Sequence, residues 1–322
     1  MRRISFVKEA HEARLRSPLT NFRLEGQPIE YRVDSLTGMT CRINIRRSMR
    51  IRQAPNAGGT HPSRIRGGRL RVGSAVLFPN MYPFSIHPAV AVFTGEHNPK
   101  LCDLHPKAIN DCLEVSMEFL RLAHEEDPKI RYGSVKWNYM YPAGASVVHL
   151  HLKVIGDVRP TMLQGRLLRE SRAYYERYGS NYWLDLVEAE MELGERLISR
   201  DGCAAWLASF APQGNNEVLG IFPEHSSILE LEGDALDALS KGVAGILKAY
   251  YDLEMESFNM AEFSGPLDEH LDYYSLNLKV TSRPRVKAYY TGDFGFIERL
   301  HMENKVESRP EELAEKLRTY LF

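Results

Sequence analysis

Residues 146–154 have the sequence SVVHLHLKV, and residues 272–280 have the sequence DYYSLNLKV. The two stretches share the pattern LxLKV and lie at a constant offset of 126 residues (275 − 149). A second pair, VFTGEH in the first half of the chain and IFPEH in the second, lies at an offset of 128 residues (225 − 97). This correspondence at a nearly fixed offset predicts two copies of one structural unit.

Both copies carry the same series of expected elements. In the first copy, strands are expected at 70–80, 87–95, 132–140 and 146–155, and the apolar positions of 105–126 have helical spacing. In the second copy the corresponding ranges are 204–212, 217–225, 255–263 and 272–282, with a helix at 234–252. The shared order predicts an α+β fold of two similar halves, in which antiparallel sheets are packed by helices.

The copies differ at two positions that carry chemistry. The first has His149 and His151 where the second has Ser275 and Asn277. Residues at i and i+2 of a strand point to the same side, so both histidines and Lys153 should share one face. Groups that donate hydrogen bonds or carry positive charge favour phosphate binding there.

An H-x-H pair alone is also typical of a half-exposed surface pair or a metal pair. The turn PAGAS at 142–146 comes directly before the expected strand. Small residues such as Gly144 and Ala145 let backbone N–H groups approach a phosphate, and the Ser146 hydroxyl adds a further donor. The turn and the histidines together therefore predict a phosphate site.

Bulk composition limits the alternatives. The chain has 322 residues, of which 43% are hydrophobic and 26% are charged, and its formal net charge is −1. This balance gives no global field for nucleic acid or anionic membranes. The four cysteines form no CxxC pair, and no run of apolar residues is long enough to span a bilayer. We expect a cytoplasmic protein with reduced thiols and with neither nucleic acid nor a membrane as partner.

The motif resembles that of the galactose-1-phosphate uridylyltransferases and the related nucleotide-sugar and dinucleotide phosphorylases of the histidine-triad superfamily. These carry an asparagine, a G-A-S turn and H-x-H-x-Q, and here Asn138, residues 144–146 and residues 149–153 occupy that pattern. FPNMYPF at 78–84 resembles the nucleoside-binding segment of the family. TGEH before residue 98 and RPEELAEKLR near the C-terminus extend the resemblance from about residue 70 to the end.

The resemblance implies a duplicated histidine-triad fold divided into four parts. Residues 1–69 are expected to form a basic, irregular and exposed entry segment packed on the first repeat. Residues 70–160 would be the first, catalytic repeat, and residues 161–200 a helical connection interrupted near 178–180. Residues 201–322 would be a second, degenerate repeat with a C-terminal helix.

The implied reaction is a double displacement. His151 would attack the α-phosphorus of a nucleoside diphosphate sugar or dinucleotide, and a sugar 1-phosphate or inorganic phosphate would then take up the nucleotide. The implied catalytic residues are His151, His149, Ser146 and Lys153. The implied nucleotide and phosphate ligands are Asn80, Asn138, Gly144, Ala145 and Ser146, with Asn80 at the nucleoside. A homodimer with composite sites is also implied.

The sequence departs from the family pattern at two places, which concern the acceptor phosphate and the binding of a metal ion. Lys153 replaces the glutamine of H-x-H-x-Q, which adds a positive charge. Many family members bind zinc through a C-x-x-C pair and two histidines, but Cys41 has no such neighbour, and only His97 and His149 match. We therefore expect no metal and no cofactor.

Further candidates have two interpretations each. Arg64, Arg66 and Arg69 could clamp a substrate phosphate or belong to a basic loop. Phe78 and Tyr82 could sandwich a base or pack in the core. Two other functions also fit the sequence: a non-catalytic nucleotide-binding protein on the same fold, and a histidine-triad hydrolase in which water replaces the acceptor. The base, the sugar and the acceptor are not determined.

Overall fold

The computed structural model of the protein describes residues 7–16, 23–46, 70–93, 99–285 and 292–321. Within these ranges the strands form a ten-stranded sheet and a separate three-stranded sheet. All strand pairings in both sheets are antiparallel.

The two halves contribute matching elements to the large sheet. The first half supplies β4 (Leu70–Val72), β5 (Ala75–Pro79), β6 (His87–Val92), α1 (Pro106–Glu126), β7 (Tyr132–Tyr139) and β8 (His151–Asp157). The second supplies β9 (Leu197–Arg200), β10 (Ala205–Ala208), β11 (Val218–Phe222), α4 (Gly233–Asp252), β12 (Ser257–Phe263) and β13 (Leu276–Arg283). Short 3-10 turns lie at Leu101–Asp103, Tyr141–Ala143 and Ile228–Glu230. The predicted α+β fold with two similar halves is confirmed.

One continuous sheet joins the halves. Its strand order is β4-β5-β6-β8-β7-β12-β13-β11-β10-β9, so corresponding strands of the two halves follow the same order from the centre of the sheet outward. The join is the pairing of β7 with β12, where Tyr139 lies opposite Phe258 and Lys136 opposite Ala261. At this join each central strand completes its backbone hydrogen bonds on the other half.

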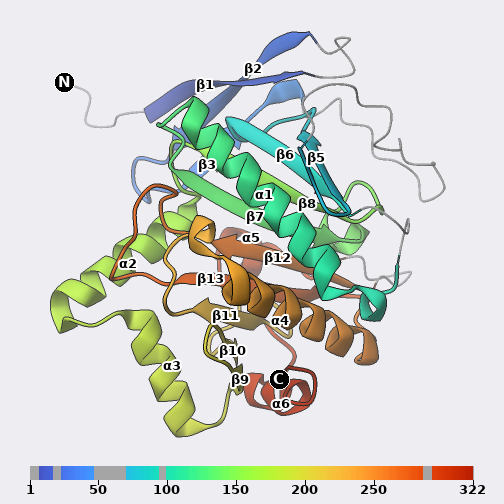
Figure 1. The fold of residues 1–322 in the computed structure, drawn as a ribbon. Coiled ribbons are helices and arrows are strands. Elements are labelled where there is room, and N and C mark those ends of the chain that lie inside the picture. Colours follow the sequence, from blue (N-terminus) through green and yellow to red (C-terminus); the bar gives the residue numbers. More distant parts are fainter. Residues whose placement is uncertain (1–6, 17–22, 47–69, 94–98, 286–291, 322) are drawn as a thin grey trace.

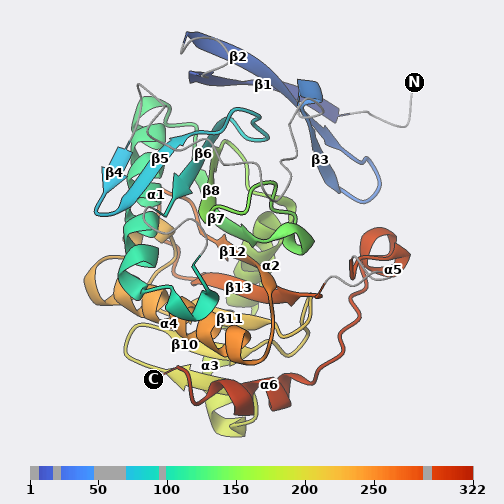
Figure 2. The same ribbon diagram turned by 90° about the vertical axis from the view of Figure 1, so that its right-hand side faces the viewer.

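Helices α1 and α4 cover one face of this sheet, as Figures 1 and 2 show. Pro106 at the first position of α1 and the His105 ring, which accepts from Lys107 N, favour the helix start. The buried side of α1 includes Ile109, Leu113 and Leu120, which lie in the main hydrophobic core with residues of α4.

Aromatic side chains fill the core at the join between the halves. The Trp137 indole is fully buried, stacks on Phe93 at a ring distance of 4.9 Å and meets the Phe258 ring edge-on at 5.0 Å. Tyr139 stacks on Phe258 at 5.4 Å. Each such pair contributes about 0.5–1.5 kcal/mol beyond its buried area, so these contacts help bind the two halves together.

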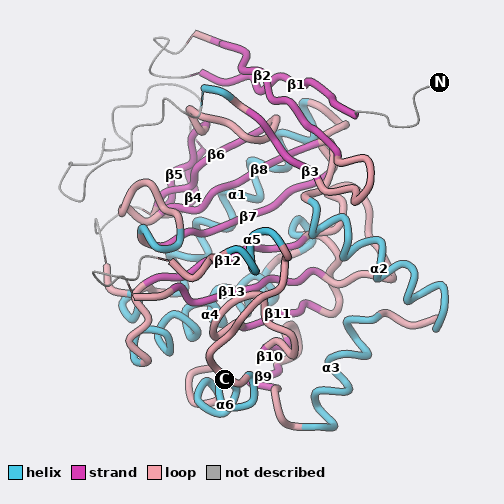
Figure 3. The backbone as a smooth tube through the Cα atoms, turned by 180° about the vertical axis from the view of Figure 1, so that it is seen from behind, coloured by secondary structure: helices cyan, strands magenta, loops and turns pink. Residues whose placement is uncertain are grey.

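The opposite face of the sheet is covered at its two ends (Figure 3). Over the second half, α3 (Tyr182–Leu193) packs Trp183 and Val187 on Leu207 and Ile221. It follows α2 (Met162–Tyr178), and the expected interruption between them is present, because Gly179 is left-handed and ends α2. The edge strand β9 already pairs with β10, so the helical part of the connection ends before residue 197.

The three-stranded sheet covers the other end. The expectation that the entry segment is irregular is therefore wrong. The sheet contains β1 (Val7–Arg16), β2 (Leu24–Val33) and β3 (Thr40–Ile43). The small core of this sheet consists of four side chains: Ala13, Leu15, Ile29 and Tyr31. Because charged residues surround these few apolar ones, the alternation of apolar and polar residues that is typical of strands is not visible in the sequence. Tyr31 donates a hydrogen bond to buried Asp157 at the end of β8, which ties this sheet to the first repeat.

The remaining helices are α5 (Phe296–Leu300) and α6 (Pro310–Leu317), the latter confirming the expected C-terminal helix. In the ranges that the structure describes, no helix combines the length and the apolar character that crossing a membrane requires.

A buried carboxyl group lies at the join between the halves. Glu262 of β12 accepts a hydrogen bond from Val135 N at 3.0 Å through Oε2, and its backbone carbonyl accepts from Ser134 Oγ at 2.9 Å. Its Oε1 has no hydrogen-bond partner within the described ranges. Burial raises the pKa of Glu262 to about 8, so the group is protonated at neutral pH.

We expect Glu262→Gln to flatten the pH dependence of stability. The carboxyl keeps its proton up to about pH 8 in the folded protein but only up to its ordinary value of 4.5 when unfolded. The free energy of unfolding of the wild type should therefore fall as pH rises through this window. Glutamine keeps the acceptor and stays neutral, so the variant should gain on the order of a few kcal/mol over the wild type near pH 9. Urea unfolding at about pH 5, 7 and 9 measures the difference; a constant difference would contradict it.

Candidate functional site

His151 opens β8 on the sheet face that turns away from α1 and α4. Leu152 and Val154 are fully buried in the core, while Lys153 is half-buried on the opposite side. This is the alternation expected from the sequence. The strand begins at His151, however, so His149 lies in the bend that leads into it, and its Nε2 lies 3.2 Å from Phe93 O.

Among the described residues, one backbone hydrogen bond orients the ring of His151. Its Nδ1 lies 2.8 Å from the carbonyl oxygen of His149. A carbonyl oxygen only accepts, so we assign the proton to Nδ1, which leaves the lone pair on Nε2. Burial lowers the pKa of His151 to about 4, and the ring is therefore neutral at physiological pH. A neutral imidazole with Nε2 unprotonated is suited to nucleophilic attack.

The second repeat makes the same contact with a different residue. Asn277 donates through Nδ2 to Ser275 O at 3.0 Å, as His151 does to the carbonyl two residues before it. Both Ser275 and Asn277 are fully buried. Asn181, which caps α3, donates to Ser275 Oγ at 3.2 Å and so seals the position from outside. The second copy of the motif is therefore part of the core.

The turn before β8 uses different backbone donors from those we expected. Gly144 N donates to Tyr141 O at 2.9 Å, and Ala145 N donates to Met140 O at 3.2 Å. These two N–H groups are spent inside the turn, because Gly144 takes a left-handed conformation with φ of 81°. The expectation that they face a phosphate is therefore wrong.

Four donors later in the chain are candidates instead. The backbone N–H groups of Ser146, Val147 and Val148, and the Ser146 hydroxyl, donate to no group in the described ranges of the chain. They lie on the bend between the turn and the histidines. Successive N–H groups of this kind can hold an anion.

Asn138 is oriented by a residue that the sequence did not reveal. Asn259 of β12 lies directly opposite Asn138 and donates through Nδ2 to Asn138 Oδ1 at 2.9 Å and to Ala143 O at 2.8 Å. This leaves the Asn138 NH2 group as a donor on the turn side, 3.8 Å from where a β-carbon on Gly144 would lie. Nothing in the sequence near Asn259 distinguished it, because its role depends on the pairing of the two halves.

Lys136 is a second residue that the sequence analysis missed. It pairs directly with Lys153 across β7 and β8, so both side chains leave the same face as His151. Lys136 is half-buried, and burial together with the charge of Arg42 lowers its pKa to about 8. The strand alternation of residues 132–140 could have indicated it, since Lys136 and Asn138 share a face.

The expected nucleoside-binding residues lie at the end of β5, two strands away from β8. Phe78 pairs with Val90, which pairs with Lys153, so Phe78 is on the same face as the lysines. Asn80 accepts from Tyr82 N at 3.1 Å, and all three expected residues are half-buried. Arg64, Arg66, Arg69 and His97 lie outside the described residues.

No group of three or more His, Cys, Asp or Glu side chains that could hold a metal ion occurs in the part of the chain described.

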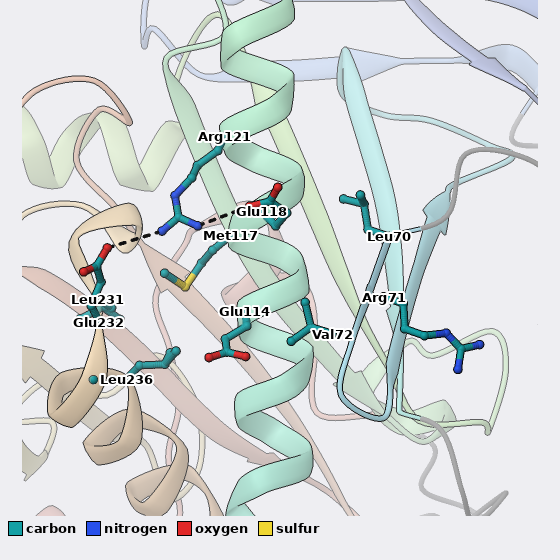
Figure 4. A pocket seen from close by; sticks show the side chains of 11 residues that line it. Leu70, Arg71, Val72, Glu114, Met117, Glu118, Arg121, Leu231, Glu232 and Leu236 are labelled. Carbon is teal, nitrogen blue, oxygen red and sulfur yellow. Dashed lines mark ion pairs between the residues drawn. The ribbon is translucent and has the colours of Figure 1, made fainter.

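A groove of about 500 Å³ lies on the helix side of the sheet, between β4, α1 and α4 (Figure 4). Its charged lining has three carboxylates, Glu114, Glu118 and Glu232, and two arginines, Arg71 and Arg121, of which Arg121 lies 3.7 Å from Glu118 and 4.0 Å from Glu232. The carboxylates outnumber the arginines, which disfavours a phosphate in this groove. The face that carries His151 is the better candidate.

We expect Asn138 and Asn259 to act as one unit in stability. Asn259→Ala removes two hydrogen bonds that hold the turn and should cost about 1–3 kcal/mol. Asn138→Ala removes one of the same bonds, so the double variant should cost less than the sum by at least about 0.5 kcal/mol. Urea unfolding of the four proteins gives this coupling energy. Additive losses would show that Asn259 does not orient Asn138.

No family model matches the chain. An uncharacterized protein from Archaeoglobus fulgidus is 29% identical over 257 residues, which cover 80% of this chain and 76% of that protein. A solved uridylyltransferase has a TM-score of 0.72 and 20% identity over 90% of this chain and 98% of its own. An ADP-glucose phosphorylase from Arabidopsis thaliana, solved with bound ADP-glucose, has a TM-score of 0.65 and 19% identity over the same shares. The chain therefore shares the fold of these two solved proteins.

Proposed function

We propose that the protein is a nucleotidyltransferase that works through a covalent nucleotidyl-histidine at His151. The observation that carries this proposal is the hydrogen bond from His151 Nδ1 to His149 O, which directs the lone pair to Nε2. Around the bend before it lie unused N–H donors and the Asn138 NH2 group. Nucleophile and anion donors are what phosphoryl-type transfer requires.

In the first half-reaction, the Nε2 lone pair attacks the α-phosphorus of the donor. The bond from this phosphorus to the bridging oxygen breaks, and the leaving phosphate takes the electron pair. The Nδ1 proton stays on the ring and donates to His149 O, which stabilises the positive charge of the substituted imidazole. The N–H groups of residues 146–148 and Asn138 bind the equatorial oxygens, where negative charge is spread.

In the second half-reaction, an oxygen of an acceptor phosphate attacks the same phosphorus. The bond to Nε2 breaks and its electron pair returns to the ring, so His151 is regenerated. We propose a nucleoside diphosphate sugar as donor and a sugar 1-phosphate or inorganic phosphate as acceptor. The fold shared with a uridylyltransferase and an ADP-glucose phosphorylase supports this class. Phe78, Asn80 and Tyr82 are our candidates for the nucleoside side.

The variant His151→Asn tests the mechanism, and the second repeat already has an asparagine at the corresponding position. Asn277 already makes the matching contact in the second repeat, so asparagine at 151 can donate to His149 O and preserve the fold. Intact mass spectrometry follows brief incubation with nucleoside diphosphate sugars, nucleoside triphosphates or dinucleoside polyphosphates. We expect the wild type to gain one acid-labile nucleoside monophosphate and the variant to gain none.

Thermal unfolding of His151→Asn is the control for folding, and its midpoint should lie within a few degrees of the wild-type value. An adduct of equal yield in the variant would place the nucleophile elsewhere. Nucleotide binding without an adduct for any donor would favour a non-catalytic binding protein, and an adduct that only water discharges would favour a hydrolase.

A further inference from the structure

We infer that Lys136 and Lys153 form a subsite for the second phosphate of the reaction: the group that leaves in the first half-reaction and the acceptor that attacks in the second. This inference rests on the proposed function. It concerns one ligand chemistry, a phosphate dianion, which inorganic phosphate or a hexose 1-phosphate could supply.

The register of the sheet places the two lysines beside the nucleophile. Lys136 and Lys153 are direct cross-strand partners on β7 and β8. Lys153 is two residues after His151 on the same strand, so their α-carbons are roughly 7 Å apart and their side chains share a face. A diphosphate whose α-phosphorus lies at His151 Nε2 can therefore reach the lysine pair with its other phosphate.

The charges around Lys136 leave an excess of positive charge. Lys136 makes no hydrogen bond or ion pair within the described ranges, although it is half-buried and directly opposite another lysine. Arg42 adds to the positive potential there and lowers the pKa of Lys136 to about 8, so the lysine is still mostly charged at neutral pH. Like charges directly opposite in a sheet are destabilising, and a bound anion removes that cost.

Two carboxyl groups, Glu262 and Asp157, act on Lys136. Burial raises the pKa of Glu262 to about 8, so this group is protonated at neutral pH and carries no charge to offset the lysine. Asp157 accepts from Arg42 at 2.6 Å, from Val158 N at 2.8 Å and from the Tyr31 hydroxyl. Its charge is already paired with Arg42, and its hydrogen bonds with Arg42 and Tyr31 tie the three-stranded sheet to the first repeat.

The second repeat provides an internal comparison. Lys279 lies 126 residues after Lys153 (279 − 153) and forms an ion pair of 2.9 Å with Glu217, a buried carboxylate. Ala261 is its cross-strand neighbour on β12, where the first repeat has Lys136. The second repeat thus has an alanine opposite its lysine, whereas the repeat with the histidine has two lysines that face each other. The extra cation belongs to the copy with the nucleophile.

Bound between these lysines, the acceptor dianion directs an oxygen at the α-phosphorus. The bond from phosphorus to that oxygen forms as the bond to Nε2 breaks, and the electron pair returns to His151. Two cations attract a phosphate dianion but not a neutral water molecule, so the subsite favours transfer to phosphate over hydrolysis.

The test separates the two half-reactions with Lys136→Met. Methionine keeps the length of the buried stem and removes the charge. We expect the variant to form the nucleotidyl adduct, but to need at least tenfold more inorganic phosphate, or hexose 1-phosphate, for half-maximal discharge. Discharge by water should be unchanged. Lys248→Met, on the exposed side of α4, is the matched control and should behave as the wild type.

Unchanged dependence of discharge on both phosphates in Lys136→Met would overturn the inference. If the wild type forms no adduct, the proposed function fails, and equilibrium binding then decides the subsite. Calorimetric titration of the free protein with inorganic pyrophosphate should show binding that Lys136→Met weakens at least tenfold. Equal binding by both proteins would overturn it.

Discussion

The pairing of β7 with β12 is the interaction on which the rest of the structure depends. It merges two half-sheets into one sheet, so neither half leaves an unpaired strand at the centre. The same ladder brings Trp137 against Phe258 on one face and Asn138 against Asn259 on the other. Core packing and site geometry are thus set by one register, and a slip of one residue would exchange the two faces.

The two repeats share one backbone arrangement, but only the first carries the candidate site. On β8 of the first repeat and β13 of the second, one side chain donates to the backbone carbonyl two residues earlier. This side chain is His151 in the first copy and Asn277 in the second. The two copies differ in the elements that cover them. Asn181 and Trp183 of α3 close the second copy, while the three-stranded sheet reaches the first copy at Asp157, near the end of β8. The duplicated unit therefore yields one candidate site and one structural half.

Local sequence patterns predicted much of this arrangement. Apolar spacing indicated α1 and α4, and the repeated LxLKV pattern indicated the duplication, because both signals depend on neighbours close in the chain. The strands before residue 47 escaped notice because charged residues outnumber their few buried apolar ones. The turn was interpreted wrongly for a related reason: its composition indicated flexibility, but not which N–H groups its own carbonyls would take up.

The sequence by itself determined the α+β class, the duplication, the fact that His151 and Lys153 share a strand face, and the loss of both histidines from the second copy. These follow from periodicity and residue identity. Only the tertiary structure decided that Asn259 orients Asn138, that Lys136 faces Lys153, and that α3 seals the second motif. Each of these joins residues distant in the chain, and such contacts are fixed by strand register and helix packing, which local composition does not encode.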